Sequence, residues 1–137
     1  MSTSTIRPFE GLCALVADDD LAFRDVVVEV LQADGFEVIA VADGDGLLRA
    51  LECAARGLMR CDLVVTDLVM PRMGAFEVLA RTARWAERPP VVVTTAYAEP
   101  GTEQRTRALG AIGPVSKPFD LADLRMIVWN AVRPVPA

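Results

Sequence analysis

The sequence lacks histidine entirely and holds a single lysine, Lys117, among its fourteen basic residues. The absence of histidine disfavours both a zinc site of the common kind and a Ser-His-Asp hydrolase. Basic residues are also fewer than acidic ones, 14 against 19. The net charge of −5 argues against a nucleic-acid-binding surface, because such a surface needs a basic field to attract phosphates.

Long apolar segments are absent as well. No run of about 20 apolar residues is available to cross a membrane. The N-terminal stretch MSTSTIRPFEG lacks the apolar core of a signal peptide, so residues 1–10 are expected to form a flexible lead. The three cysteines show no CxxC spacing. This pattern favours reduced thiols in a cytoplasmic protein.

The composition that remains is that of a globular chain. A length of 137 residues suits one domain, and hydrophobic residues make up 53% against 24% charged. We expect the domain to span residues 11–133, with residues 134–137 as a tail.

Apolar runs and helically spaced apolar residues alternate five times along the chain. Such alternation predicts a doubly wound α/β fold, in which helices cover both faces of a parallel sheet. Ligands of these sheets bind beyond the carboxyl ends of the strands. The predicted strands are residues 12–17, 37–42, 63–66, 91–95 and 114–116, and the predicted helices are residues 23–31, 45–56, 75–86, 102–109 and 121–131.

Chemically useful side chains follow four of the five predicted strands. Three aspartates at one edge of a sheet would repel one another unless a cation joined them, and oxygen ligands of this kind suit Mg²⁺. A carboxylate beside Mg²⁺ can also act as a nucleophile toward phosphorus. A hydroxyl and an ammonium would complete an anion site. The residues concerned are Asp18, Asp19, Asp67, Thr95 and Lys117.

Each of these residues also has an ordinary structural explanation. An aspartate after a strand is usually a turn residue or a helix cap, and Asp20 is predicted to cap the helix that follows it. Thr95 alone would be a β-branched strand residue. The functional hypothesis depends on the joint occurrence of these groups at the strand ends.

Four motifs make the chain resemble the receiver domains of two-component response regulators: LVADDD (15–20), DLVVTDLVMPRMG (62–74), VVVTTA (91–96) and SKPF (116–119). The resemblance implies a flavodoxin-like, five-stranded sheet of order 2-1-3-4-5, and a stand-alone type like the chemotaxis response regulator. It implies that Asp67 accepts a phosphoryl group from a histidine of a sensor kinase or a histidine phosphotransfer protein. A downstream protein target, not identified by the sequence, would read the result.

The resemblance also assigns the individual roles. Mg²⁺, with Mn²⁺ as a possible substitute, would be held by Asp18, Asp19, Asp67 and the backbone carbonyl of Val69. Thr95 and Lys117 would contact the phosphoryl group, and the Lys117–Pro118 bond is expected to be cis. The domain would catalyse only its own phosphotransfer and dephosphorylation.

The chain departs from the family pattern at several positions. Gly74 and Ala75 stand where an acidic residue and glycine are usual. Pro114 replaces the aromatic residue often found three positions before the lysine, so the switch candidates are Thr95, Tyr97 and Pro114. Val69 and Tyr97 flank the route of an attacking water and are poorly suited to activating it, which predicts slow dephosphorylation.

Two alternatives remain. Asp18-x-Asp20 matches the nucleophile motif of haloacid-dehalogenase-type phosphatases, but that family needs a further acidic pair and usually a cap domain. A receiver-like scaffold that is never phosphorylated is disfavoured, because every reactive position is intact.

Overall fold

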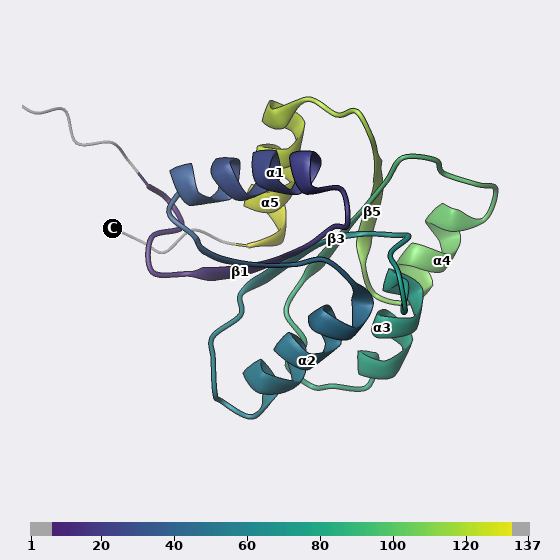
Figure 1. Cartoon of the computed structure of the whole chain (residues 1–137), viewed down its shortest axis with the longest axis horizontal. Coiled ribbons are helices and arrows are strands. Elements are labelled where there is room, and N and C mark those ends of the chain that lie inside the picture. The colour runs from purple at the N-terminus through teal and green to yellow at the C-terminus, as the bar shows by residue number, and fades with distance from the viewer. Residues whose placement is uncertain (1–6, 133–137) are drawn as a thin grey trace, which may run out of the picture.

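The structure is a computed structural model that describes residues 7–132. A five-stranded parallel sheet of order β2-β1-β3-β4-β5 lies at its centre (Figure 1). The strands are β1 (Cys13–Ala17), β2 (Glu37–Val41), β3 (Leu63–Asp67), β4 (Val91–Thr95) and β5 (Ile112–Ser116). The helices are α1 (Leu21–Ala33), α2 (Gly44–Ala55), α3 (Ala75–Thr82), α4 (Thr102–Ala108) and α5 (Leu121–Ala131). The predicted fold class and strand order are therefore confirmed.

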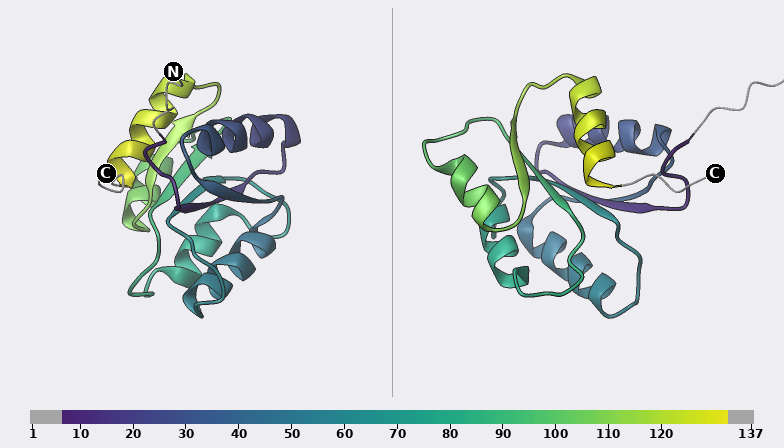
Figure 2. Two further views of the ribbon diagram at one scale, coloured as in Figure 1. Left: turned by 90° about the vertical axis from the view of Figure 1, so that its left-hand side faces the viewer. Right: turned by 180° about the vertical axis from the view of Figure 1, so that it is seen from behind.

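Helices cover both faces of the sheet, as Figures 1 and 2 show. Alternate residues of β1 point into two separate cores, because successive side chains of a strand face opposite ways. Ala14 and Val16 join the core beneath α1 and α5, whereas Leu15 and Ala17 join the core shared with α2 and α3. The continuous apolar runs of the central strands follow from burial on both faces.

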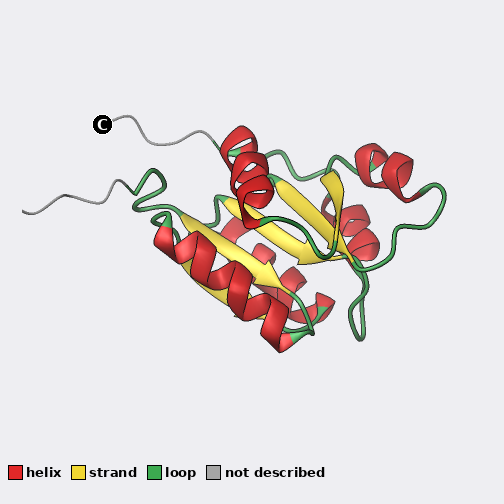
Figure 3. Cartoon of the chain, turned by 90° about the horizontal axis from the view of Figure 1, so that it is seen from above, coloured by secondary structure: helices red, strands yellow, loops and turns green. Residues whose placement is uncertain are grey.

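The outer strand β2 is different. All five of its residues are exposed or half-buried, as expected for an edge strand. Figure 3 shows the layered arrangement from above, with helices on either side of the strands. Because all five strands are parallel, their carboxyl ends and the loops that follow them meet at one edge of the sheet. Among residues 7–132, no helix has the length and apolar character needed to cross a bilayer.

Most element boundaries lie within two residues of the prediction, and the end of α3 differs by four. Helix α3 ends at Thr82 rather than at residue 86. The Thr82 hydroxyl donates back to the Val78 carbonyl, and the guanidinium of Arg88 donates to the Leu79 carbonyl, so the last turn is closed by side chains. Strand β5 begins at Ile112, two residues earlier than predicted, because pairing with β4 continues across the irregular position at Gly113 and Pro114.

The N-terminal boundary also differs. The sequence places residues 7–10 in a flexible lead, but Phe9 is buried and stacks on Phe36 with ring centroids 4.7 Å apart. The backbone N–H of Phe9 donates to the Asp34 carbonyl at the end of α1. Gly35 has a φ of 113°, and a Cβ there would lie 2.5 Å from the Glu10 nitrogen, so only glycine fits beneath this segment. The predicted tail, residues 134–137, lies outside the described residues.

Candidate functional site

Three aspartates meet at the carboxyl edge of the sheet. Asp18 follows β1, Asp19 comes next, and Asp67 is the last residue of β3. One carboxylate oxygen from each lies within 4.8 Å of those from the other two. Asp18 is only 2% exposed, Asp67 is half-buried and Asp19 is exposed, so the cluster opens to solvent on one side. The structure thus brings together all three carboxylates that the sequence singled out.

Lys117 provides the cation of this cluster. Its Nζ lies 2.8 Å from Asp18 Oδ2 and 3.5 Å from Asp67 Oδ2, and its side chain is 13% exposed. The same ammonium lies 4.1 Å from the centroid of the Phe23 ring. The following Lys117–Pro118 bond is cis, as expected. The ammonium therefore offsets part of the repulsion among the carboxylates.

The environment of Asp67 changes its acidity. Burial raises the pKa of this carboxyl above its ordinary value, and the neighbouring charge of Asp18 raises it further. The Lys117 ammonium acts in the opposite direction but does not cancel the rise in pKa. A second cation beside Asp67 would favour the charged, nucleophilic form.

Asp20 does not join the cluster. Its side chain accepts a hydrogen bond from the Phe23 N–H at 3.2 Å and caps α1, as predicted. Its own N–H donates to Asp18 Oδ1 at 2.9 Å, which fixes the Asp18 carboxylate. The Asp18-x-Asp20 pair is therefore divided between a site residue and a helix cap, an arrangement that does not support a phosphatase nucleophile motif.

Thr95 lies at the end of β4 and is buried. Its hydroxyl donates to the Tyr97 carbonyl at 3.1 Å and accepts from the Tyr97 N–H at 3.2 Å. The hydroxyl is thus engaged by its own loop in this structure. An anion at Asp67 would have to draw it away from Tyr97.

Val69 and Tyr97 lie in two loops, each two residues beyond a site residue, Asp67 and Thr95. Both are exposed, with exposed fractions of 72% and 78%. Neither carries a carboxylate or amide. Their expected effect on an attacking water stays a prediction.

The loop after β3, which carries the Val69 carbonyl, is held against α2. Gly44 approaches it so closely that a Cβ would lie 1.9 Å from the Met73 carbonyl oxygen. Arg72, with a φ of 71°, places its guanidinium 3.7 Å from Asp43 and 3.9 Å from Asp45. Ala75, in the usual place of glycine, is fully buried at the start of α3. The loop between β3 and α3 is therefore well packed, although its residues depart from the family pattern.

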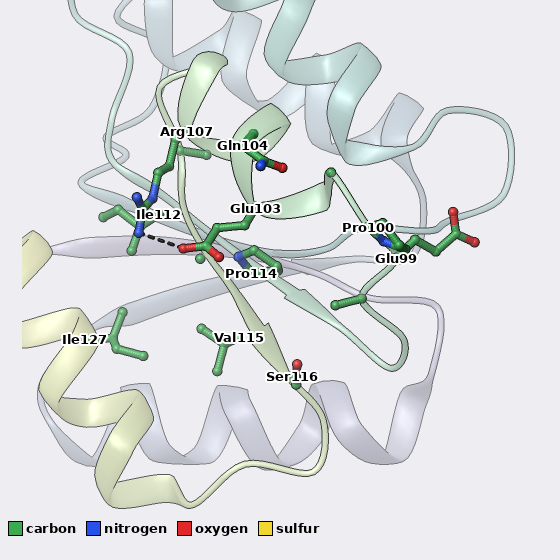
Figure 4. Close-up of a pocket in the computed structure, with 14 residues that line it drawn as sticks. Glu99, Pro100, Glu103, Gln104, Arg107, Ile112, Pro114, Val115, Ser116 and Ile127 are labelled. Carbon is green, nitrogen blue, oxygen red and sulfur yellow. Dashed lines mark ion pairs between the residues drawn. The ribbon is translucent and has the colours of Figure 1, made fainter.

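Pro114 lies away from the aspartates, in a groove between α4, β5 and α5 with a volume of about 940 Å³ (Figure 4). Its peptide bond with Gly113 is cis. Across the groove, Arg107 and Glu103 of α4 form an ion pair of 2.7 Å. Of the three switch candidates, Thr95 and Tyr97 are therefore in direct contact, whereas Pro114 belongs to a separate surface.

The sequence reasoning missed Phe23. Its ring packs against the core beneath α1 and α5 and also contacts the site lysine. No local pattern signals this contact, because the two residues are distant in the sequence and meet only through the fold.

A fold and site of this kind define a phosphoacceptor signalling domain. The family model for the response regulator receiver domain matches residues 14–128, and the chain belongs to that family.

Curated relatives and a solved structure agree with the assignment. The chain is 33% identical to sporulation initiation phosphotransferase F of Bacillus subtilis, over 81% of this chain and 86% of that protein. It is 38% identical to the DNA-binding transcriptional regulator NtrC of Bradyrhizobium, but spans only 24% of that protein's length. The structure of the chemotaxis protein CheY4 of Vibrio cholerae is 28% identical, with a TM-score of 0.77 over 88% of this chain and 98% of that one.

Proposed function

We propose that Asp67 accepts a phosphoryl group from a phosphohistidine and that the resulting aspartyl phosphate changes a protein-docking surface. The observation that supports this most directly is the grouping of Asp67 with Asp18, Asp19 and Lys117 at the tip of a buried strand. In the transfer, a carboxylate oxygen of Asp67 forms the new P–O bond while the P–N bond to the histidine breaks, and the leaving imidazole nitrogen takes up a proton.

The carboxylate cluster fits a hard divalent cation. Asp18, Asp19 and Asp67 offer oxygen ligands only, and one side of the cluster faces solvent, which leaves room for water ligands. We propose these three residues, with the Val69 carbonyl, as the ligands of Mg²⁺, for which Mn²⁺ could substitute. When bound, the metal would neutralise charge that develops on the transferring phosphoryl oxygens.

The chain's own residues position the reacting groups. Lys117 is already between Asp18 and Asp67, so its ammonium is placed to bind an oxygen of the phosphoryl group on Asp67. The Thr95 hydroxyl, now bound to the Tyr97 backbone, would turn toward another oxygen. Loss of the Tyr97 contacts would release the exposed loop after β4. Thr95 and Tyr97 are therefore the proposed switch, with Pro114 as a less mobile part of the docking surface.

The proposed partners follow from this chemistry. A sensor histidine kinase or a histidine phosphotransfer protein would supply the phosphoryl group, and a protein target would bind the switched surface. The net charge of −5 does not favour nucleic acid as a partner. The three free cysteines of the chain suit a reducing compartment such as the cytoplasm. Beyond its own phosphorylation and dephosphorylation, we assign the domain no enzymatic turnover.

Labelling by a small phosphodonor tests this function. Incubation with acetyl phosphate and Mg²⁺ should add one phosphoryl group to the intact mass of the protein. The label should be absent in EDTA and in Asp67→Asn. Glu99→Gln, an exposed substitution in the loop before α4, serves as a control that should keep the label. Full labelling of Asp67→Asn would refute the assignment.

A second assay separates the proposal from a phosphatase. A phosphatase would release p-nitrophenol from p-nitrophenyl phosphate over many turnovers, whereas the proposed receiver would not. Sustained release that depends on Asp18 but not on Asp67 would favour the phosphatase instead.

A further inference from the structure

The aromatic ring of Phe23 lies against the single lysine of the chain. Lys117 Nζ is 4.1 Å from the ring centroid, well within the range of about 6 Å in which a cation is attracted to the negative face of a ring. Phe23 comes from the first turn of α1, whereas Lys117 comes from the loop after β5. The contact therefore joins two segments that both border the phosphorylation site.

The ring is held in a fixed orientation. Phe119 packs against Phe23 with centroids 5.2 Å apart and ring planes at 90°. Both rings also pack against the core beneath α1 and α5. An edge-to-face pair anchored in a core restricts rotation of the ring. The face that Phe23 presents to the ammonium is thus part of the rigid fold.

The ring gives the ammonium a neighbour that is not a hydrogen-bond acceptor of the carboxylate or hydroxyl kind. An ammonium has three donors, and those of Lys117 have the carboxylates of Asp18 and Asp67 within reach. An aromatic face attracts the cation without offering a carboxylate or hydroxyl oxygen as a competing acceptor. It therefore keeps the ammonium near Asp67 while leaving its donors available for phosphoryl oxygens.

We infer that Phe23 is a positioning residue for phosphoryl transfer, and that its ring face holds the Lys117 ammonium at Asp67. The inference rests on the proposed function, because the reaction that it aids is the phosphorylation of Asp67. With acetyl phosphate as donor, Asp67 forms a P–O bond while the bond between phosphorus and the acetyl oxygen breaks and acetate leaves. Phe23 takes no part in these bonds and acts only through Lys117.

A fluorination series separates the electrostatic role from packing. Phenylalanine with one, two or three ring fluorines, introduced at position 23, keeps nearly the same shape but weakens the negative face. The rate of labelling by acetyl phosphate should fall stepwise, reaching a loss of roughly threefold to tenfold, as expected for a contact of this kind. In Phe23→Leu, which has no ring face, the rate of labelling should fall at least as far.

The chain offers a matched control. Phe76 of α3 has the guanidinium carbon of Arg105 at 4.6 Å from its ring centroid, and it packs on the core shared with α2 and α3, on the other face of the sheet from Phe23. The same fluorination at position 76 should leave the rate of labelling unchanged. Equal rates across the series at position 23 would overturn the inference, as would equal losses at positions 23 and 76.

A spectroscopic readout does not depend on phosphorylation. Because Lys117 is the only lysine, protein labelled with ¹³C-lysine gives one set of side-chain signals that needs no assignment. The ring current of Phe23 should shift the terminal methylene protons upfield, and Phe23→Leu should remove that shift. Unchanged lysine signals in Phe23→Leu would overturn the inference. If the unsubstituted protein took no label, the proposed function would fail, and the lysine shift would still decide whether Phe23 holds the ammonium.

Discussion

The surroundings of Asp67 make its ionised carboxylate unfavourable for the stability of the metal-free protein. Burial and the neighbouring Asp18 raise the pKa of Asp67, so the folded protein binds this proton more tightly than the unfolded chain does. The stabilising effect of that proton is complete below the ordinary aspartate pKa of about 4, and it is lost as the pH rises through the higher folded pKa. Ionised Asp67 therefore destabilises the metal-free fold near neutral pH.

Asp67→Asn should relieve this destabilisation. In EDTA, we expect the free energy of unfolding of the variant to exceed that of the unsubstituted protein at pH 7, with a smaller excess at pH 4. Urea titrations at the two pH values provide the measurement. An excess of equal size at both would contradict the ionisation argument. Asp123→Asn, an exposed change in the first turn of α5, is the control for general charge effects.

The lifetime of the phosphoryl group is also set at the residue scale. Val69 and Tyr97 are exposed two residues beyond Asp67 and Thr95, and neither can act as an effective base toward a water that approaches phosphorus in line. We predict a half-life of minutes or longer at pH 7, followed as loss of labelled mass after the donor is removed. Val69→Asn or Tyr97→Glu should shorten it, whereas Leu58→Asn, at an exposed position in the α2–β3 connection, should not. Decay within a few seconds in the unsubstituted protein would refute this account.

At the scale of elements, α4 is secured unequally at its two ends. It begins at Thr102, and the preceding Gly101 has a φ of 89° and provides no side-chain cap. Its C-terminus is tied to α3 by Arg88, which donates to the Leu109 carbonyl at 2.7 Å and to the Leu79 carbonyl at 3.1 Å. A guanidinium at a helix C-terminus is favoured by the orientation of the peptide dipoles. Movement that begins at Thr95 should therefore be largest in the loop and the first turn of α4.

Hydrogen exchange tests which elements change when a phosphoryl group is placed on Asp67. With beryllofluoride as a phosphoryl mimic and Mg²⁺ present, we expect altered protection in residues 96–110, greatest before Thr102, and little change in residues 111–116. Asp67→Asn exposed to the same reagents provides the blank. Protection that changes around Pro114 and in α5 but not in residues 96–110 would show that another element carries the switch.

The sequence predicted the elements well where local pattern decides them. The strand-end aspartates, Thr95 and Lys117 could be placed at one edge because parallel topology brings strand ends together. Boundaries that depend on distant residues were missed: α3 ends early because Arg88 and Thr82 satisfy its last carbonyls. The Phe23–Lys117 contact was likewise beyond prediction, since it depends on how α1 packs against the loop after β5.

At the scale of the whole molecule, the two helices that cover one face of the sheet, α1 and α5, are fastened to each other. The guanidinium of Arg125 on α5 binds the carboxylate of Asp34, the residue that follows α1. Phe9 lies over the same region and contacts the Trp129 ring, with centroids 6.0 Å apart. The helices on this face are therefore joined by an ion pair and by aromatic packing, and α1 in turn supports the loop with Asp18.

Metal binding should be visible as a change in global stability. A cation that binds only the folded state stabilises it by about 2.7 kcal/mol at a hundredfold excess over Kd. For a domain of this size that corresponds to a rise in Tm on the order of 10 °C. We predict such a rise with Mg²⁺ in a thermal melt and its loss in Asp19→Ala. An unchanged response in Asp19→Ala would mean that the metal binds elsewhere. Glu77→Ala, a substitution on α3 outside the aspartate cluster, should keep the rise in Tm.

The central claim is that Asp67 itself carries the phosphoryl group. Borohydride reduces an aspartyl phosphate to homoserine and so marks the residue permanently. After treatment with acetyl phosphate and Mg²⁺, we expect peptide mass spectrometry to find homoserine at position 67 and at no other aspartate. Homoserine at Asp18 or Asp20, or its absence from a protein that has taken up the label, would contradict the account.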